Sequence, residues 1–251
     1  FTISNALRAL WFGITNAVFV RTPVSGPGHR YCQKLTRLST AFAFISDIAM
    51  LSLGGALKRK EKISGRFADV LSHMYLASAV IKRFEDDGRP EADIPLMCWA
   101  CDYCLHEAEK TLVIILKNFP NAFLAWLMGG LVFPMGRRYQ VPNDARGHEV
   151  AKLLLEPSAA RDRLTAGIFV SQDPKDTTGR LEDALPKVIA AEALERKLHR
   201  LVEENPVLHG DMAAQIKEAL RQEIFTAAEA ELVRAAHAAR RAVIAVDDFK
   251  A

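Results

Sequence analysis

Three cysteines lie three residues apart in the segment MCWACDYC, at Cys98, Cys101 and Cys104. Thiolates at this spacing hold zinc or iron–sulfur clusters, and thiols of lowered pKa act as redox switches. An iron–sulfur cluster would also need a fourth thiolate and a flexible loop, and the only other cysteine, Cys32, is far away in the sequence. The chemistry of the three thiols therefore depends on the element that carries them.

The element expected around these cysteines is a helix over about residues 96–118. One apolar stripe at three- and four-residue spacing runs along it and consists of Cys98, Cys101, Leu105, Ala108, Leu112, Ile115 and Phe119. The charged residues of this helix fall off the stripe: Asp102, Glu109, Lys110 and Lys117. Cys104 lies at its flank. We interpret the cysteines as small core residues, with a metal or cluster site and redox sensing as the alternatives.

Other short patterns do not complete a motif. His106 and Glu107 begin the zinc-protease pattern H-E-x-x-H, but residue 110 is lysine. The segment LGGALKRKEK lacks the glycine spacing and the preceding strand of a phosphate-binding loop. We interpret residues 58–60 as a solvated helix face, with a phosphate or acidic head group as the alternative ligand. The remaining histidines show no metal-ligand spacing: 29, 73, 148, 199, 209 and 237.

Asp47 is the most unusual charged residue of the sequence, because it lies inside the otherwise apolar run AFAFISDIAMLSLGG. A buried carboxylate must be paired, hydrogen-bonded or protonated. We therefore predict an ion pair between Asp47 and a neighbouring helix, with a catalytic acid as the alternative. The acidic segment KRFEDDGRPEAD is typical of an exposed corner at a helix end.

Helical periodicity runs through almost the whole chain, and alternating strand patterns are nearly absent. The sequence predicts an all-α fold: an antiparallel bundle of long helices followed by a smaller helical subdomain. All three Trp and all four Tyr lie before residue 140, so we place the bundle at 1–140 and an Ala/Glu/Arg-rich extension at 141–251. The helices are expected at 4–20, 29–54, 64–87, 96–118, 122–133, 144–155, 158–167, 181–203, 211–223 and 226–245. We expect Gly54–Gly55 to interrupt the second helix, and Pro186 to kink its helix or lie in its first turn.

Charge and composition argue against a nucleic-acid-binding protein and against a disulfide-stabilised one. The 251 residues include 33 Lys and Arg against 30 Asp and Glu, a formal charge of +3, which gives no strong attraction to nucleic acid. Four cysteines do not indicate a disulfide scaffold. The apolar start lacks the basic region and cleavage site of a signal peptide, and since residue 1 is Phe we expect a piece of a longer protein.

We interpret the apolar stretches Ser39–Leu57 and Ala122–Met135 as buried helices, with docking on a membrane surface beside Arg137 and Arg138 as the alternative.

One long run, RLSTAFAFISDIAMLSLGGALKRKEKISGRFADVLSHMYLASAVIKRFEDDGRPEADIPL, closely resembles the C-terminal region of the large bacterial long-chain acyl-CoA dehydrogenases. The resemblance continues through further segments and covers nearly the whole chain. These segments are AEKTLVIILKNFPN (108–121), FPMGRRYQVPND (133–144), VAKLLLEPSAARDRL (150–164), the weaker LEDALPKVIAAE (181–192) and VDDF (246–249). The cysteine trio departs from the family pattern, in agreement with a packing role.

The resemblance implies a part of a larger enzyme of fatty-acid β-oxidation. Such enzymes use FAD: a glutamate removes the α-proton of a fatty acyl-CoA, the β-hydride passes to the flavin, and the product is a trans-2-enoyl-CoA. In the family the catalytic glutamate lies upstream of the region that Phe1 begins, and Glu85, Glu91 and Glu107 match other parts of the family. We therefore expect no catalytic, cofactor-binding or metal-binding residue in this chain.

The same resemblance implies the partners. They are the upstream dehydrogenase core of the same polypeptide, a fatty acyl-CoA, an electron-transfer acceptor and further copies in a homo-oligomer, in the cytoplasm or at the inner face of the cytoplasmic membrane. We expect no nucleic-acid partner. By analogy with the very-long-chain relatives, segment 122–135 with Arg137 and Arg138 would form or support a membrane contact. The alternative is a helical scaffold or membrane adaptor without chemistry.

Overall fold

The computed structural model describes residues 1–171, 173, 175–204 and 211–245. Within these residues every regular element is a helix: ten α-helices, two short 3₁₀ helices and no strand, so the all-α prediction is confirmed. The chain divides into two compact units, Phe1–Leu153 and Leu154–Ala251.

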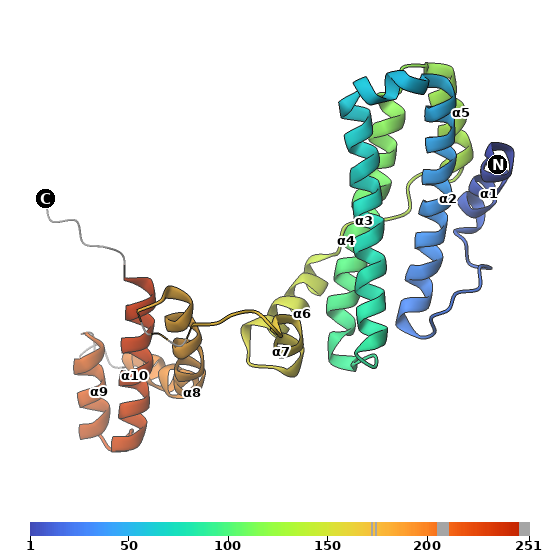
Figure 1. Cartoon of the computed structure of the whole chain (residues 1–251). Helices are drawn as coiled ribbons and strands as arrows, with labels where there is room; N and C mark the ends of the chain where they lie inside the picture. Colours follow the sequence, from blue (N-terminus) through green and yellow to red (C-terminus); the bar gives the residue numbers. More distant parts are fainter. Residues whose placement is uncertain (172, 174, 205–210, 246–251) are drawn as a thin grey trace, which may run out of the picture. The chain divides into compact units, whose positions relative to one another are not determined.

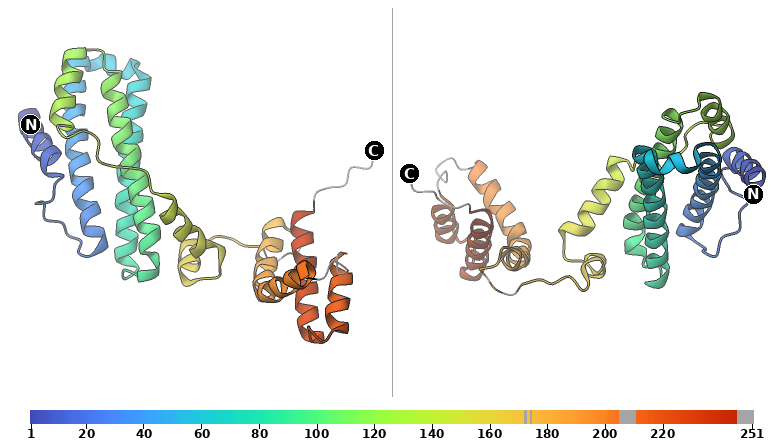
Figure 2. Two further views of the ribbon diagram at one scale, coloured as in Figure 1. Left: turned by 180° about the vertical axis from the view of Figure 1, so that it is seen from behind. Right: turned by 45° about the horizontal axis from the view of Figure 1, so that its top comes forward.

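Unit 1 is built around three long helices, α2 (Pro27–Leu53), α3 (Glu61–Asp86) and α4 (Ile94–Lys117), which lie side by side (Figure 1). Short connections make successive helices antiparallel, as predicted. The helix α1 (Thr2–Thr15) packs against α2 and α5 (Ala122–Val132), and α5 also contacts α4 (Figure 2). The unit continues into α6 (Asp144–Leu155).

The connection between α2 and α3 shows how local sequence sets the helix ends. Gly54 adopts φ 49° at the end of α2, a left-handed conformation that glycine adopts without steric cost. The chain then forms the 3₁₀ helix η1 (Gly54–Arg59) before α3 begins, so the predicted interruption at Gly54 is confirmed. Residues 58–60 are exposed there, in agreement with a solvated basic face.

The core of unit 1 is formed by the facing stripes of α2, α3 and α4. Its most deeply buried members are Leu38, Phe44, Ile45, Val70, Ala77, Cys101, Leu105, Ala108, Leu112 and Ile115. Every residue of the predicted stripe from Cys101 to Phe119 is buried, and Cys98 is half-buried. The period of apolar residues in the sequence therefore identified the core face of α4.

The interpretation of residues 122–135 as a buried helix is wrong for most of its surface. Met128 and Val132 of α5 are buried, but Phe123 is 66% exposed and Trp126 is 73% exposed. The helix is apolar on all sides, so the sequence could not show which side faces the bundle. The stretch Ser39–Leu57 is likewise buried on one face only, since Met50 and Leu51 are exposed.

Unit 2 contains α7 (Ala159–Thr165), α8 (Thr177–Glu204), α9 (Met212–Arg221) and α10 (Ala227–Ile244). Its core is small and rich in alanine: Ala191, Leu198, Ile216, Ala219, Phe225, Ala230, Val233 and Ala236. Pro186 lies inside α8 because this helix begins at Thr177. His209 and the VDDF segment at 246–249 lie outside the described residues.

Length and composition alone would let one helical stretch of the described chain, Pro27–Arg59, cross a membrane. Its apolar residues include much of the unit 1 core, namely Leu38, Ala41, Phe44, Ile45 and Ala49. A core helix meets the same criteria as a spanning helix, so this finding is weak evidence for a membrane span.

Candidate functional site

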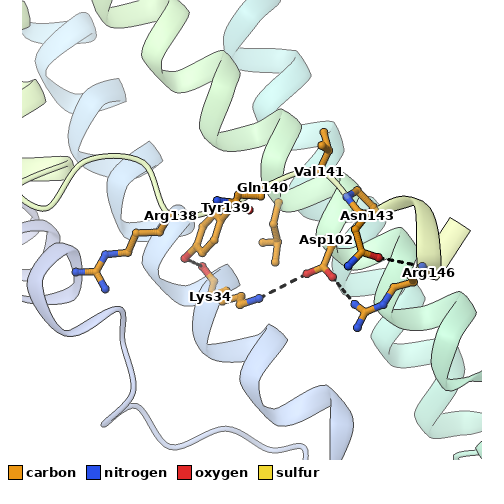
Figure 3. Close-up of a pocket in the computed structure, with 10 residues that line it drawn as sticks. Lys34, Asp102, Arg138, Tyr139, Gln140, Val141, Asn143 and Arg146 are labelled. Atoms are coloured by element: carbon orange, nitrogen blue, oxygen red, sulfur yellow. Dashed lines mark hydrogen bonds and ion pairs between the residues drawn. The ribbon is translucent and has the colours of Figure 1, made fainter.

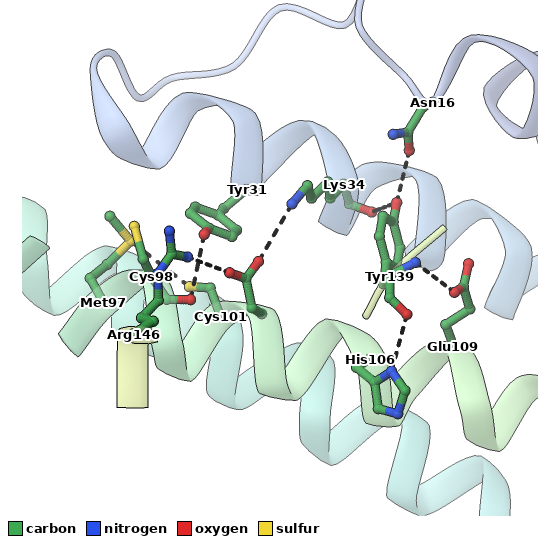
Figure 4. A network of polar contacts seen from close by, with 11 residues as sticks. Asn16, Tyr31, Lys34, Met97, Cys98, Cys101, His106, Glu109, Tyr139 and Arg146 are labelled. Carbon is green, nitrogen blue, oxygen red and sulfur yellow. Dashed lines mark hydrogen bonds and ion pairs between the residues drawn. The ribbon is translucent and has the colours of Figure 1, made fainter. Parts of the chain in front are cut away.

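The strongest polar feature of unit 1 is a buried ion pair between Arg37 and Glu109, which holds a loop against the helices. The Glu109 side chain on α4 is fully buried, and its Oε1 accepts a hydrogen bond from Arg37 Nη1 on α2 at 3.1 Å. Its Oε2 accepts from the backbone N–H group of Arg138 at 3.0 Å and from that of Tyr139 at 2.9 Å. Figure 4 shows the contact between Glu109 and Tyr139. One carboxylate therefore joins α2, α4 and the segment that follows α5.

Aromatic rings complete the surroundings of Arg37. The guanidinium carbon lies 5.0 Å from the ring centre of Tyr139 and 5.8 Å from that of Phe133. Among the described residues its Nε and Nη2 have no hydrogen-bond partner, so the ring faces supply the remaining favourable contact. Burial raises the pKa of the Tyr139 hydroxyl, which donates to Asn16 Oδ1 at 3.0 Å.

A polar pocket of about 310 Å³ lies beside this ion pair (Figure 3). Asp102 on α4 lies between two cations: Oδ1 is 3.6 Å from Lys34 Nζ and Oδ2 is 2.6 Å from Arg146 Nη1 on α6. The lining holds three cations, Lys34, Arg138 and Arg146, against the single carboxylate of Asp102, so the pocket carries a net positive charge. The pocket is lined by Lys34, Asp102, Leu105, Arg138, Tyr139, Gln140, Val141, Pro142, Asn143 and Arg146.

This network was missed because its members belong to elements far apart in the sequence. A local signal did exist: Leu105, Glu109, Leu112 and Leu116 form a second row at helical spacing, and all four are buried. A charged residue inside such a row indicates a buried partner, and Arg37 lies in a comparable row of α2. Glu109, placed off the stripe in the sequence, thus lies on a second buried face of α4.

The cysteines occupy packing positions. Cys101 and Cys104 are buried, Cys32 and Cys98 are half-buried, and all four thiols are free. The Cys101 Sγ lies 3.9 Å from the carbonyl oxygen of Ala77 and 4.0 Å from Met97 Sδ. Burial raises the pKa of the Cys101, Cys104 and Cys32 thiols, which suppresses the reactive thiolate. No group of three potential ligands that could hold a metal ion occurs within the described part of the chain.

Asp47 does not form the predicted ion pair. Its Oδ2 accepts a hydrogen bond of 2.9 Å from Asn5 Nδ2 on α1, and the side chain is half-buried. Among the described residues no cation contacts Asp47 closely enough to form an ion pair with it. A neutral amide satisfies the carboxylate because one of its sides still reaches solvent. Asp47 therefore fixes α1 on α2.

The remaining candidates have ordinary surroundings. His106 donates from Nδ1 to the carbonyl oxygen of Tyr139 at 3.0 Å, and Glu107 pairs with Lys110 at 3.0 Å. The acidic corner after α3 is exposed except at the half-buried Glu85, and it is bound by pairs four residues apart, such as Arg89 with Glu85 at 2.6 Å. Its carboxylates neutralise neighbouring cations and do not converge on one point.

Comparison with known proteins identifies the family. No solved structure matches the chain significantly. The family described as acyl-CoA dehydrogenase, C-terminal, bacterial type, matches residues 1–249. That match spans both compact units and includes the loop that Glu109 holds. The chain therefore belongs to the bacterial-type acyl-CoA dehydrogenase C-terminal family, in the oxidoreductase context that the sequence resemblance implied.

Proposed function

We propose that this chain is the C-terminal helical support of an FAD-dependent acyl-CoA dehydrogenase that oxidises fatty acyl-CoA to trans-2-enoyl-CoA. The family match over residues 1–249 carries this proposal. The support holds the catalytic region of the same polypeptide and contributes no catalytic residue. The working enzyme is a cytoplasmic homo-oligomer that passes electrons to a separate acceptor.

The surroundings of three buried or half-buried carboxylates, Glu109, Asp102 and Asp47, favour a supporting role. A base that removes an α-proton must have a lone pair facing the substrate. Glu109 instead accepts from three donors, Asp102 lies between two cations, and Asp47 accepts from Asn5. Each carboxylate already links two elements of the fold.

Two pockets of unit 1 offer no group of donors suited to FAD, which supports this assignment. Its pyrophosphate needs several backbone N–H groups or cations directed at one point. The pocket beside Asp102 places a carboxylate between its cations. A groove of about 450 Å³ between α2 and α3 is lined by apolar and hydroxyl side chains, with Arg8 as its single cation. We therefore assign FAD binding to the dehydrogenase core.

The decisive experiment compares three proteins: the complete enzyme, the complete enzyme without this chain, and the chain alone. We expect the chain alone to be helical by circular dichroism, colourless, and inactive on palmitoyl-CoA. We expect the truncated enzyme to lose most of its activity or its bound flavin, because its support is missing. Bound flavin with turnover in the chain alone, or full activity of the truncated enzyme, would contradict the proposal, and the second result would favour a scaffold or adaptor module.

A second role, attachment to a membrane surface, is favoured by the outer face of α5. Phe123 and Trp126 are exposed there, their rings 6.2 Å apart, and Arg137 is exposed nearby in the sequence. Aromatic and cationic side chains together favour the interface of an anionic bilayer. Arg138 contributes less than expected to this surface, because its Nη2 donates to the carbonyl oxygen of Ile14 at 3.1 Å.

Co-sedimentation of the complete enzyme with anionic vesicles tests this second role. Phe123→Asp combined with Arg137→Glu should abolish binding. Leu71→Asp combined with Lys62→Glu makes the same charge change at exposed positions of α3 and should leave binding intact. Equal binding of both double variants and the unmodified enzyme would exclude a role for α5 in membrane attachment.

A further inference from the structure

The first helix has two apolar faces, one turned to the bundle and one exposed. Its inner face consists of small residues, Ala6, Ala9 and Gly13, and packs against the bundle. A Cβ atom on Gly13 would approach Pro134 Cδ to 2.7 Å, so this contact is too close for a side chain. The outer face is a stripe at helical spacing with exposures of 79% for Ile3, 65% for Leu7, 55% for Trp11 and 49% for Ile14.

Two exposed aromatic residues extend the outer stripe of α1. Phe1 and Phe19 are also exposed, and the Phe19 ring stacks on Trp11 with centres 6.3 Å apart. A contiguous exposed apolar patch marks an interaction site. Something must therefore cover the outer stripe in the working enzyme.

The stripe is held in place before any partner binds. Asn5 of α1 binds Asp47 of α2, and Arg138 binds the carbonyl oxygen of Ile14. Just after the helix, Arg30 Nη1 donates to the carbonyl oxygen of Asn16 at 2.9 Å. These contacts fix α1 on unit 1, so the stripe is a preorganised surface.

We infer that this stripe docks on the dehydrogenase core that precedes it in the polypeptide; the inference rests on the proposed function. The matched family is the C-terminal part of the enzyme and its match starts at residue 1, so α1 is the helix of the matched region that lies nearest to the core in the family's sequence order. Consecutive elements of a chain usually pack against each other. No other described helix of unit 1 combines this position with a continuous exposed apolar stripe.

The charge around α1 favours the dehydrogenase core over a second copy of the chain as the partner that covers the stripe. Residues 1–46 contain five Lys and Arg and no Asp or Glu. A second copy of the chain, docked through the same stripe, would bring the cationic surroundings of two identical helices together, which is unfavourable. The core surface that receives the stripe is therefore apolar at its centre, with carboxylates at its rim to meet cations such as Arg8.

Thiol labelling at the centre of the stripe tests the inference. Leu7→Cys places a thiol on the outer face, and Lys62→Cys places a control thiol at an exposed position of α3. Maleimide labelling is followed by peptide mass spectrometry, which separates these sites from the four native cysteines. In the chain alone, both introduced thiols should react at similar rates.

In the complete enzyme without lipid, we expect labelling at residue 7 to become at least about tenfold slower, because a covered thiol reacts only after local opening. The control rate should not change, and the slowing should not depend on protein concentration. An unchanged rate at residue 7 would overturn the inference. Slowing only with anionic vesicles would assign the stripe to a membrane, and slowing only at high concentration would assign it to a second copy.

The labelling result at residue 7 and the proposed function of the chain can fail independently of each other. If removal of the chain abolishes activity while residue 7 stays reactive, the support role stands and the docking surface is wrong. Circular dichroism of both cysteine variants shows that a change in labelling does not reflect unfolding.

Discussion

Units 1 and 2 achieve stability in different ways. Unit 1 holds 19 Lys and Arg against 13 Asp and Glu, together with every Trp and Tyr of the chain, and it buries an Arg–Glu pair among large side chains. Unit 2 holds 14 basic against 17 acidic residues, and half of its core residues are alanine. Its ion pairs, such as Arg240 with Glu195 at 2.7 Å, lie at least partly in solvent.

This difference indicates which substitutions should lower the unfolding free energy of each unit most. Alanine cores let helices approach closely but remove little apolar area from water, so helix caps and local pairs matter more in unit 2. Unit 1 depends on one buried carboxylate that joins three segments. Because all Trp residues belong to unit 1, Trp fluorescence follows its unfolding separately from the circular dichroism of the whole chain.

The largest expected effect is on the buried pair of unit 1. Glu109→Ala leaves Arg37 buried without its carboxylate and should cost about 3–5 kcal/mol of unfolding free energy. Denaturant titration should show the Trp transition shifted to lower denaturant, with unit 2 unaffected. Glu107→Ala, which removes an exposed pair with Lys110, is the matched control. A uniform shift of both units would mean that they do not unfold independently.

A smaller effect is expected from the core cysteine. Cys101→Ser places a hydroxyl at a fully buried position and should destabilise unit 1 by about 1–3 kcal/mol. Cys98→Ser, at a half-buried position, should cost less. Thermal unfolding followed by Trp fluorescence ranks the two variants. If both variants instead lost a bound metal, detected by elemental analysis, the packing interpretation would fail.

In unit 2 the N-terminus of α10 is the sensitive point. Thr226 Oγ1 accepts from the Glu229 N–H at 3.2 Å, and Glu229 Oε2 accepts from the Thr226 N–H at 2.8 Å. Thr226→Ala removes half of this capping box and should destabilise unit 2 by about 1 kcal/mol. Circular dichroism should detect the loss while the Trp transition stays fixed. Thr226→Ser keeps the hydroxyl and should restore stability.

The smallest expected effect is a pH dependence confined to α9. Hydrogen bonds from Arg221 and Gln222 lower the pKa of Glu218 to about 2 from an ordinary 4.5. A lowered pKa means that the carboxylate stabilises unit 2 fully above pH 4.5 and that this contribution is lost as the pH falls toward 2. Glu218→Gln should therefore reduce stability at pH 7 slightly and flatten its decline below pH 4.5. Parallel curves for the two proteins would contradict the assignment.

Much of the fold followed from the sequence because helix formation is local. All ten expected helices occur, with Gly54 ending α2 and Asn121 capping α5 through its side chain. The stripe from Cys101 to Phe119 predicted the buried face of α4. The polar network was not predicted, because Arg37 and Glu109 are 72 residues apart and neither has a partner within its own helix.

The sequence by itself determined the helices, the apolar stripes and the family, since each depends on spacing within a short stretch or on long similarity. Only the tertiary structure decided that Glu109 is buried, that Asp47 binds an amide, and that the outer faces of α1 and α5 remain exposed. Burial and pairing depend on which surfaces meet, and a helix that is apolar on all sides, as α5 is, carries no local mark of the side that faces the core.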